Sequence, residues 1–149
     1  MKIAIVHGPN LRLLGKREPN LYGETTLEEI NLALEALAQE LGVELEIFQS
    51  NHEGEILDFL EEVQPRVQGI LINPAGLTHT SVSLRDGLLA TDLPVVEVHL
   101  SNPAAREEFR HRSFVAPIAV GTVAGFHSNS YLLALQALHA YLADPRTES

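Results

Sequence analysis

Residues 2–9 have the sequence KIAIVHGP, in which four consecutive apolar residues precede a histidine and the turn formers Gly8 and Pro9. A short apolar run bounded by a glycine and a proline predicts a buried β-strand over Lys2 to His7. Comparable runs predict further strands over residues 69–72, 95–99 and 116–123. Nearly continuous apolar strands of this kind are typical of a parallel sheet that is covered on both faces.

Helical patterns alternate with these strands. Leucine and isoleucine recur at three- and four-residue spacing over residues 27–41, after two overlapping capping boxes that begin at Thr25 and Thr26. Gly42 then occupies the position of a left-handed C-cap, and residues 43–47 alternate between apolar and acidic side chains as in a half-buried strand. Further helices are predicted over residues 56–63, 81–90, 104–110 and 131–142. The alternation predicts one α/β domain, with helices on both faces of a parallel sheet.

Composition excludes several classes of function. The chain of 149 residues is 45% hydrophobic, which is sufficient for one domain with a core. Its formal net charge of −10 makes nucleic acid an unfavourable partner, and no Lys/Arg-rich cluster offsets that charge. The absence of cysteine excludes disulfides and thiolate chemistry. No apolar run approaches the roughly 18 residues of a membrane span, so we expect a cytoplasmic protein with no membrane partner.

Three polar clusters directly follow predicted strands, at residues 7–10, 73–79 and 99–102. In open parallel sheets, ligands bind outside the carboxyl ends of the strands, where the strand order reverses. We therefore expect the three clusters to converge on one binding site. Three arginines are candidates for binding a carboxylate there, namely Arg106, Arg110 and Arg112. Exposed arginines on a helix are, however, more often solvated.

Residues 8–23 contain three glycines and two prolines, so we expect a connection there with no regular element. Its part at residues 15–23 contains Arg17 and Tyr22 between two glycines. A tyrosine has an ordinary pKa of about 10, and a fixed cation nearby lowers that pKa by favouring the phenolate. Tyr22 is therefore a candidate base. A solvated loop in which Tyr22 merely packs explains this segment, taken alone, more simply.

Glu97 and His99 lie at i and i+2 near the end of a predicted strand, so their side chains point to the same face. A carboxylate beside an imidazole is a common way to orient a general acid. An ordinary polar pair at a sheet edge is an equally good interpretation of these two residues taken alone.

Other common site motifs are absent from the sequence. The glycines of residues 8–15 do not have the spacing of a phosphate-binding P-loop, and no G-x-G-x-x-G follows a strand. None of the seven histidines belongs to an H-E-x-x-H pair, so the sequence gives little support to a metal site.

Four separated motifs, in this order along the chain, closely resemble those of the type II 3-dehydroquinate dehydratases, small enzymes of the shikimate pathway. The motifs are H-G-P-N-L-x-L-L-G-x-R-E-P-x-x-Y-G at 7–23, Q-S-N-x-E-G-E at 49–55, N-P-x-G-L-T-H-T-S at 73–81 and E-V-H-L-S-N at 97–102, followed by R-E-E-F-R at 106–110. The resemblance spans nearly the whole chain, and four motifs together are far more specific than any one.

This resemblance implies a flavodoxin-like fold with strand order 2-1-3-4-5 and a single catalytic domain over residues 1–149. It implies a mobile lid over about residues 15–23 and a homododecamer of four trimers, with neither metal nor another cofactor. We further expect residues 144–149 to form a disordered tail. The implied reaction is the anti elimination of water from 3-dehydroquinate through an enolate, in aromatic amino acid biosynthesis.

The resemblance also implies a catalytic role for five residues. Tyr22 removes the C2 proton of the substrate, and Arg17 holds the phenolate. Asn10 stabilises the enolate through a water molecule. His99, oriented by Glu97, protonates the departing C1 hydroxyl. These roles agree with elementary chemistry, because loss of a proton next to a ketone creates an oxyanion and loss of hydroxide requires an acid.

The substrate-binding residues follow from the same motifs. Asn73 and the backbone N–H groups of Leu100 and Ser101 are expected to bind the carboxylate. The ring hydroxyls are expected to contact His79 and Arg110. Asp86 is expected to reach the site from a neighbouring subunit.

Two departures from the family pattern and two rival functions stay open at this point. Arg12 stands where asparagine is common, and residues 126–130 are poorer in glycine than usual, so local loop shape is in doubt. One rival is a non-catalytic flavodoxin-like module that binds a flavin or a protein, because fold alone does not establish function. The other is a lyase or isomerase that acts on a related cyclic hydroxyketone.

Overall fold

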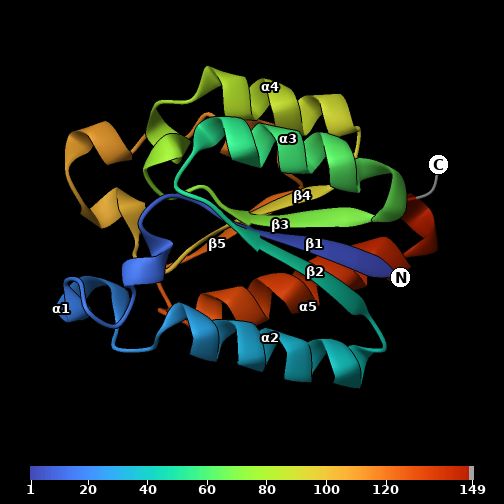
Figure 1. Cartoon of the computed structure of the whole chain (residues 1–149), viewed down its shortest axis with the longest axis horizontal. Coiled ribbons are helices and arrows are strands. Elements are labelled where there is room, and N and C mark those ends of the chain that lie inside the picture. Colours follow the sequence, from blue (N-terminus) through green and yellow to red (C-terminus); the bar gives the residue numbers. More distant parts are fainter. Residues whose placement is uncertain (148–149) are drawn as a thin grey trace.

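The computed structural model describes residues 1–147, which contain a five-stranded sheet of order β2-β1-β3-β4-β5 (Figure 1). The strands are β1 (Lys2–His7), β2 (Glu44–Gln49), β3 (Gly69–Asn73), β4 (Val95–His99) and β5 (Gly121–Ala124). All neighbouring strands pair in parallel. The α/β class and the strand order implied by the family resemblance are therefore confirmed.

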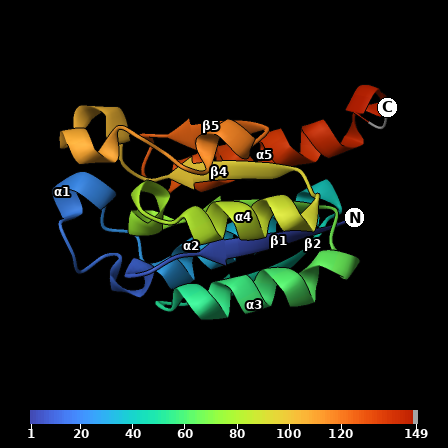
Figure 2. The ribbon, with the colours of Figure 1, turned by 90° about the horizontal axis from the view of Figure 1, so that it is seen from above.

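Helices form a layer on each face of the sheet. The helices are α1 (Pro19–Tyr22), α2 (Leu27–Leu41), α3 (Glu53–Val63), α4 (Val82–Thr91) and α5 (Asn129–Ala143). One face is covered by α2 and α5 and the other by α3 and α4 (Figures 1 and 2). The single-turn helix α1 lies with the turns that follow β4, drawn in orange, at the end of the sheet opposite the termini (Figure 2).

The central strand β1 shows why both layers form. Ile3 and Ile5 pack with α2 and α5, whereas Ala4 and Val6 pack with α3 and α4. This division follows from the two-residue period of a strand. Burial of a large aliphatic side chain stabilises a fold by roughly 1.5–3 kcal/mol, so a strand that is apolar on both sides favours the centre of the sheet.

Local capping agrees with the sequence. The side chain of Thr26 accepts a hydrogen bond from the N–H of Glu29 at 3.2 Å, as the second capping box predicts. α2 ends at Gly42, whose φ of 72° is the predicted left-handed conformation. Ser81 caps α4 in the same way, through the N–H of Leu84 at 2.8 Å.

Residues 8–23 are more regular than expected. They contain a 3-10 turn at Leu11–Leu13 and the helix α1. Pro19 occupies the first position of α1, where its fixed φ is already helical and an N–H is not needed. The expectation of a connection with no regular element was therefore wrong.

Two further expected elements differ from the structure. The strand expected from residue 116 begins only at Gly121, and Ala116–Ile118 form a 3-10 turn. Pro117 has no N–H to donate to a strand ladder, which accounts for the late start. The helix expected over residues 104–110 is a pair of 3-10 turns, Pro103–Ala105 and Glu108–Arg110.

The carboxyl-terminal tail that we expected to be disordered from residue 144 contains a 3-10 turn at Pro145–Thr147. Residues 148 and 149 of that tail lie outside the described residues. Within residues 1–147, no helix combines the length and the apolarity that a membrane crossing requires.

Candidate active site

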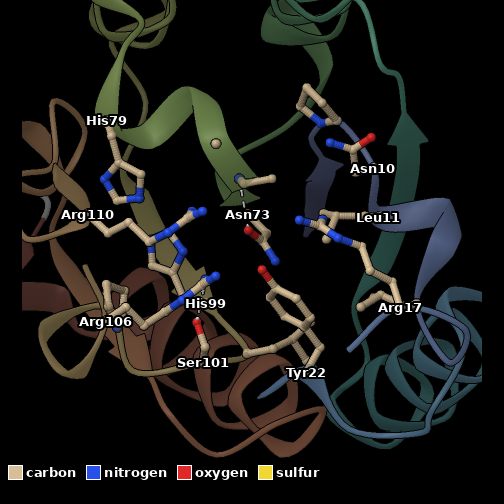
Figure 3. A pocket seen from close by; sticks show the side chains of 16 residues that line it. Asn10, Leu11, Arg17, Tyr22, Asn73, His79, His99, Ser101, Arg106 and Arg110 are labelled. Carbon is tan, nitrogen blue, oxygen red and sulfur yellow. Dashed lines mark hydrogen bonds between the residues drawn. The ribbon is translucent and has the colours of Figure 1, made fainter. Parts of the chain in front are cut away.

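A cavity of about 190 Å³ lies at the carboxyl ends of β1, β3 and β4 (Figure 3). Its wall comes from the loop after β1, the loop after β3 and the segment after β4. β1 lies between β2 and β3, so this is the place where the strand order reverses. The three polar clusters of the sequence therefore converge where open parallel sheets bind ligands.

Gly8 allows the loops after β1 and β3 to approach each other. A Cβ atom at Gly8 would lie 2.6 Å from the carbonyl oxygen of Pro74, and the Gly8 N–H donates to the carbonyl of Asn73 at 2.8 Å. Any side chain there would force the two loops apart. Asn10 follows with a φ of 72°, a left-handed conformation that asparagine tolerates, and its side chain lines the cavity.

Tyr22 is the last residue of α1 and lines the cavity half-buried. The chain can leave α1 sharply because Gly23 has a φ of 88°. The guanidinium carbons of Arg17 and Arg106 each lie 5.3 Å from the centroid of the Tyr22 ring. The Tyr22 hydroxyl points into the cavity between these two arginines (Figure 3). Two cations thus act on one phenol.

Glu97 and His99 form a buried pair at the end of β4. Oε2 of Glu97 lies 3.1 Å from Nε2 of His99, and the two residues are 3% and 8% exposed. His99 lines the cavity. Glu97 is outside the lining and contacts the imidazole of His99. Nε2 of His99 has no aligned hydrogen bond among the described residues, so its approach to Glu97 is a close polar contact that becomes an ion pair when the imidazole is protonated. The pair places an imidazole beside a carboxylate at the cavity wall.

Asn73 and His79 are oriented by the backbone around them. Oδ1 of Asn73 accepts from the N–H of Ala75 at 3.0 Å, so the amide nitrogen is the end that donates elsewhere. Nδ1 of His79 lies 2.8 Å from the carbonyl oxygen of Arg112. A carbonyl only accepts, so Nδ1 carries a proton, and in a neutral ring Nε2 is then an acceptor. The cavity therefore offers both a donor and an acceptor for polar substituents of a ligand.

The charge of the cavity wall is opposite to that of the whole protein. Arg17, Arg106 and Arg110 line the cavity, and no Asp or Glu is among its described lining residues. Arg110 is paired with Glu107 beside the cavity, and this pair lowers the pKa of the Glu107 carboxyl. In a chain with a net charge of −10, a wall with these arginines is suited to an anionic ligand.

Most of the expected site residues are brought together by the fold. All of them line the cavity except Glu97, which contacts His99, and Asp86, which lies exposed on α4. The sequence understated Arg106, which appeared there only as one of three possible carboxylate ligands. The four-residue spacing between Arg106 and Arg110 indicated that the two side chains could share one face of a helix. No neighbouring residue in the sequence predicted the contact of Arg106 with Tyr22.

The loop at residues 126–130, where the chain departs from the family pattern, contacts the end of the Tyr22 segment. A Cβ atom at Gly23 would lie 3.2 Å from Nδ1 of His127. His127 itself has a φ of 52°, and the Ser130 hydroxyl accepts from the N–H of Phe126 at 2.9 Å. The loop thus contains a left-handed residue that is not glycine.

The donors of this cavity are phenol, imidazole, amide and guanidinium groups. In the part of the chain that the structure describes, no three His, Asp or Glu side chains are grouped so that they could hold a metal ion. The fold and the cavity define a flavodoxin-like α/β protein with a cavity whose lining suits a small anionic molecule.

Comparison with known proteins identifies the family. Residues 1–139 match the family described as Dehydroquinase class II. A 3-dehydroquinate dehydratase from Halothermothrix orenii is 55% identical over 137 residues, which are 92% of this chain and 93% of that protein. The protein of the same name from Geotalea daltonii is 51% identical over 142 residues, which are 95% of this chain and 99% of that protein.

Solved structures agree with the sequence relatives. A type II dehydroquinase from Butyrivibrio crossotus has a TM-score of 0.90 and 39% identity, over 93% of this chain and 97% of that one. A 3-dehydroquinate dehydratase-like protein from Bifidobacterium longum has a TM-score of 0.71 and 28% identity, over 97% of this chain and 99% of that one. The chain therefore belongs to the class II dehydroquinase family, a family of hydro-lyases, and the resemblance inferred from the four motifs is confirmed.

Proposed function

We propose that the protein is a type II 3-dehydroquinate dehydratase, which converts 3-dehydroquinate to 3-dehydroshikimate and water by anti elimination through an enolate. The proposal rests mainly on the residues that line one cavity. A tyrosine there lies between two guanidinium groups, and a histidine of the lining contacts a buried carboxylate. Loss of a proton and of hydroxide requires a base and an acid, and the cavity contains a candidate for each.

Tyr22 is the base in this proposal. Its phenolate removes the proton at C2, next to the ketone, and the electrons of the broken C–H bond form the enolate. Arg17 and Arg106 hold the phenolate, and their guanidinium carbons each lie 5.3 Å from the centroid of its ring. Asn10 lines the same cavity and, through a water molecule, stabilises the enolate oxygen.

His99 is the acid. The enolate electrons form the C1–C2 double bond while the C1–O bond breaks, and the proton from His99 makes the departing hydroxide a neutral water. Glu97 keeps the ring of His99 oriented through their 3.1 Å contact. Solvent then takes the proton that Tyr22 acquired and returns one to His99, so the enzyme is restored with no other reactant.

The remaining lining residues bind the substrate. Asn73 and the backbone N–H groups of Leu100 and Ser101 bind the carboxylate, and His79 and Arg110 contact the ring hydroxyls. The arginine-rich wall supports this assignment, because it favours an anion in a protein that is otherwise strongly acidic.

Asp86 completes the site from a second subunit. Its exposed position on α4, outside the lining of the cavity, is consistent with a role across an interface. We propose a homododecamer of four trimers on this basis and on the family resemblance. The proposal includes a cytoplasmic location, the shikimate pathway as the biological role and a reaction with no metal or other cofactor.

The direct test is to add 3-dehydroquinate to the purified protein and to follow the conjugated enone of the product by ultraviolet absorbance. We expect turnover by the wild-type protein and near-complete loss in His99→Ala, with the variant still folded because His99 lies at the end of a strand. A protein with no turnover would favour a non-catalytic binding module. Faster turnover of a related cyclic hydroxyketone would favour a different lyase.

A further inference from the structure

The carboxylate of Glu97 has a second contact besides His99. Its Oε1 accepts a hydrogen bond from the hydroxyl of Ser113 at 2.6 Å, while Oε2 lies 3.1 Å from Nε2 of His99. Each oxygen of one buried carboxylate therefore has a partner. Rotation of that carboxylate would break both contacts, so Ser113 restricts the orientation that Glu97 presents to His99.

The hydroxyl of Ser113 is itself held by the backbone. Its Oγ accepts hydrogen bonds from the N–H of Val115 at 3.1 Å and from the N–H of Ala116 at 2.9 Å. A hydroxyl has two acceptor positions and one proton. Since both acceptor positions are used, the proton is directed to Glu97. The direction of the Ser113–Glu97 bond is thus set by the turn that follows Ser113.

We infer that Ser113 is a positioning residue for the acid step, which holds the carboxylate of Glu97 and, through it, the ring of His99. The inference rests on the proposed role of His99 as the acid. Ser113 is outside the lining of the cavity, so it acts on the reaction only through this chain of contacts. A hydrogen bond from a hydroxyl to a carboxylate is charge-assisted and short, which suits it to fixing geometry. Proton transfer depends on such geometry within the reacting complex.

A purely structural role for Ser113 must be distinguished from this one, because its hydroxyl also supports the turn at Ala116–Ile118. The chain offers a matched control in Ser50. The Ser50 hydroxyl donates to Oε2 of Glu55 at 2.6 Å and accepts from the N–H of His52 at 2.9 Å. Ser50 therefore combines a carboxylate contact and a turn contact like those of Ser113. Glu55, however, is outside the cavity lining and makes no hydrogen bond or ion pair with a histidine within residues 1–147.

The experiment compares the steady-state kinetics of Ser113→Ala and Ser50→Ala in the intact enzyme with 3-dehydroquinate. We expect kcat of Ser113→Ala to fall about tenfold with KM changed less than about twofold, since the substrate contacts are untouched. Ser113→Thr keeps the hydroxyl and should restore most of kcat. Ser113→Cys keeps the size but has a weak donor, so it should be slow and folded. Ser50→Ala should have the kcat of the wild type.

A double-mutant cycle tests whether Ser113 acts through Glu97. In a Glu97→Ala background, Ser113→Ala should cause no further loss of kcat, because the link to His99 no longer exists. An unchanged kcat in Ser113→Ala and Ser113→Cys, or an equal loss with and without Glu97, would overturn the inference while wild-type activity upholds the proposed function. A wild-type protein with no turnover would instead contradict both.

Discussion

Nδ1 of His7 lies 2.9 Å from the hydroxyl of Tyr131, and both side chains are fully buried. On the other side of the ring, Nε2 of His7 lies 2.8 Å from the amide oxygen of Asn31. That oxygen only accepts, so Nε2 carries the proton and Nδ1 accepts from Tyr131. The Tyr131 hydroxyl in turn interacts with Asn73, a lining residue of the cavity, and burial raises the pKa of Tyr131. A largely buried series of polar contacts thus connects α2 and α5 to Asn73 in the cavity wall.

This series of contacts predicts a specific loss of stability in acid. Burial lowers the pKa of His7 from 6.5 to about 4. Between these two values the unfolded chain binds a proton that the folded chain does not, so the free energy of unfolding falls as the pH falls from 6.5 to 4. The contribution is complete above pH 6.5 and its full loss amounts to about 3 kcal/mol.

The measurement is the free energy of unfolding in urea between pH 4 and 7, at one protein concentration. His7→Asn removes the titrating group, so the difference between wild type and variant should shrink as the pH falls to 4. A difference that stays constant with pH would show that His7 is not held neutral by burial.

Tyr22→Phe removes one hydroxyl from the cavity and should abolish most of the turnover. General bases contribute on the order of 100- to 10,000-fold, so kcat should fall within that range. The ring stays in place between the two arginines, and binding of 3-dehydroquinate, measured by calorimetry, should be retained. Normal kcat in this variant would remove Tyr22 as the base.

Arg17→Gln and Arg106→Gln should each lower kcat far more than they weaken substrate binding. Both guanidinium carbons lie 5.3 Å from the Tyr22 ring centroid, so each substitution removes one positive charge from beside the base. A loss on the order of 100-fold is comparable to removal of one charge-stabilising group from an active site. Arg112→Gln is the matched control, because Arg112 lies 4.7 Å from the ring of Phe114 and outside the cavity lining. A rise in KM alone would make Arg17 or Arg106 a substrate-binding residue.

Turnover should survive exhaustive chelation. The cavity has its own candidate acid and base, and the residues that line it are not the cluster of carboxylates and imidazoles that binds a divalent ion. Activity is measured after prolonged dialysis against a chelator and again after addition of divalent ions. Loss of activity that a metal restores would refute the metal-free reaction.

Asp86 should act in the site of a neighbouring subunit. Sedimentation should show a large closed oligomer, and Asp86→Ala should be poorly active although Asp86 is exposed in the single chain. Co-expression of Asp86→Ala with Tyr22→Phe should recover part of the activity, because a hybrid oligomer contains sites with a normal Tyr22 and a partner's normal Asp86. No recovery, or a fully active monomer, would contradict a role across the interface.

The sequence predicted those features that depend on residues close together in the chain. The buried strand β1, the cap at Thr26 and the left-handed Gly42 each follow from a few neighbouring residues. The pairing of Glu97 with His99 is of the same kind, because a two-residue period puts both on one face of β4. The strand order came from the family resemblance, since hydrophobic periodicity does not rank strands within a sheet.

Single helical turns and 3-10 turns were beyond local prediction. The segments at 8–23, 104–110 and 116–123 were misassigned because a periodic pattern needs more residues than one turn contains. Their shape depends on the contacts that they make with distant parts of the chain.

Only the tertiary structure showed which residues that are distant in the sequence meet in and around the site. Ser113 meets Glu97 across 16 positions of sequence, and His7 meets Tyr131 across 124. Arg106 contacts the ring of Tyr22 from the side opposite to Arg17. No sequence pattern around either Arg106 or Tyr22 predicts that contact. The physical reason is that the course of the chain through the parallel sheet determines which distant side chains become neighbours, whereas propensity and periodicity act over one or two turns.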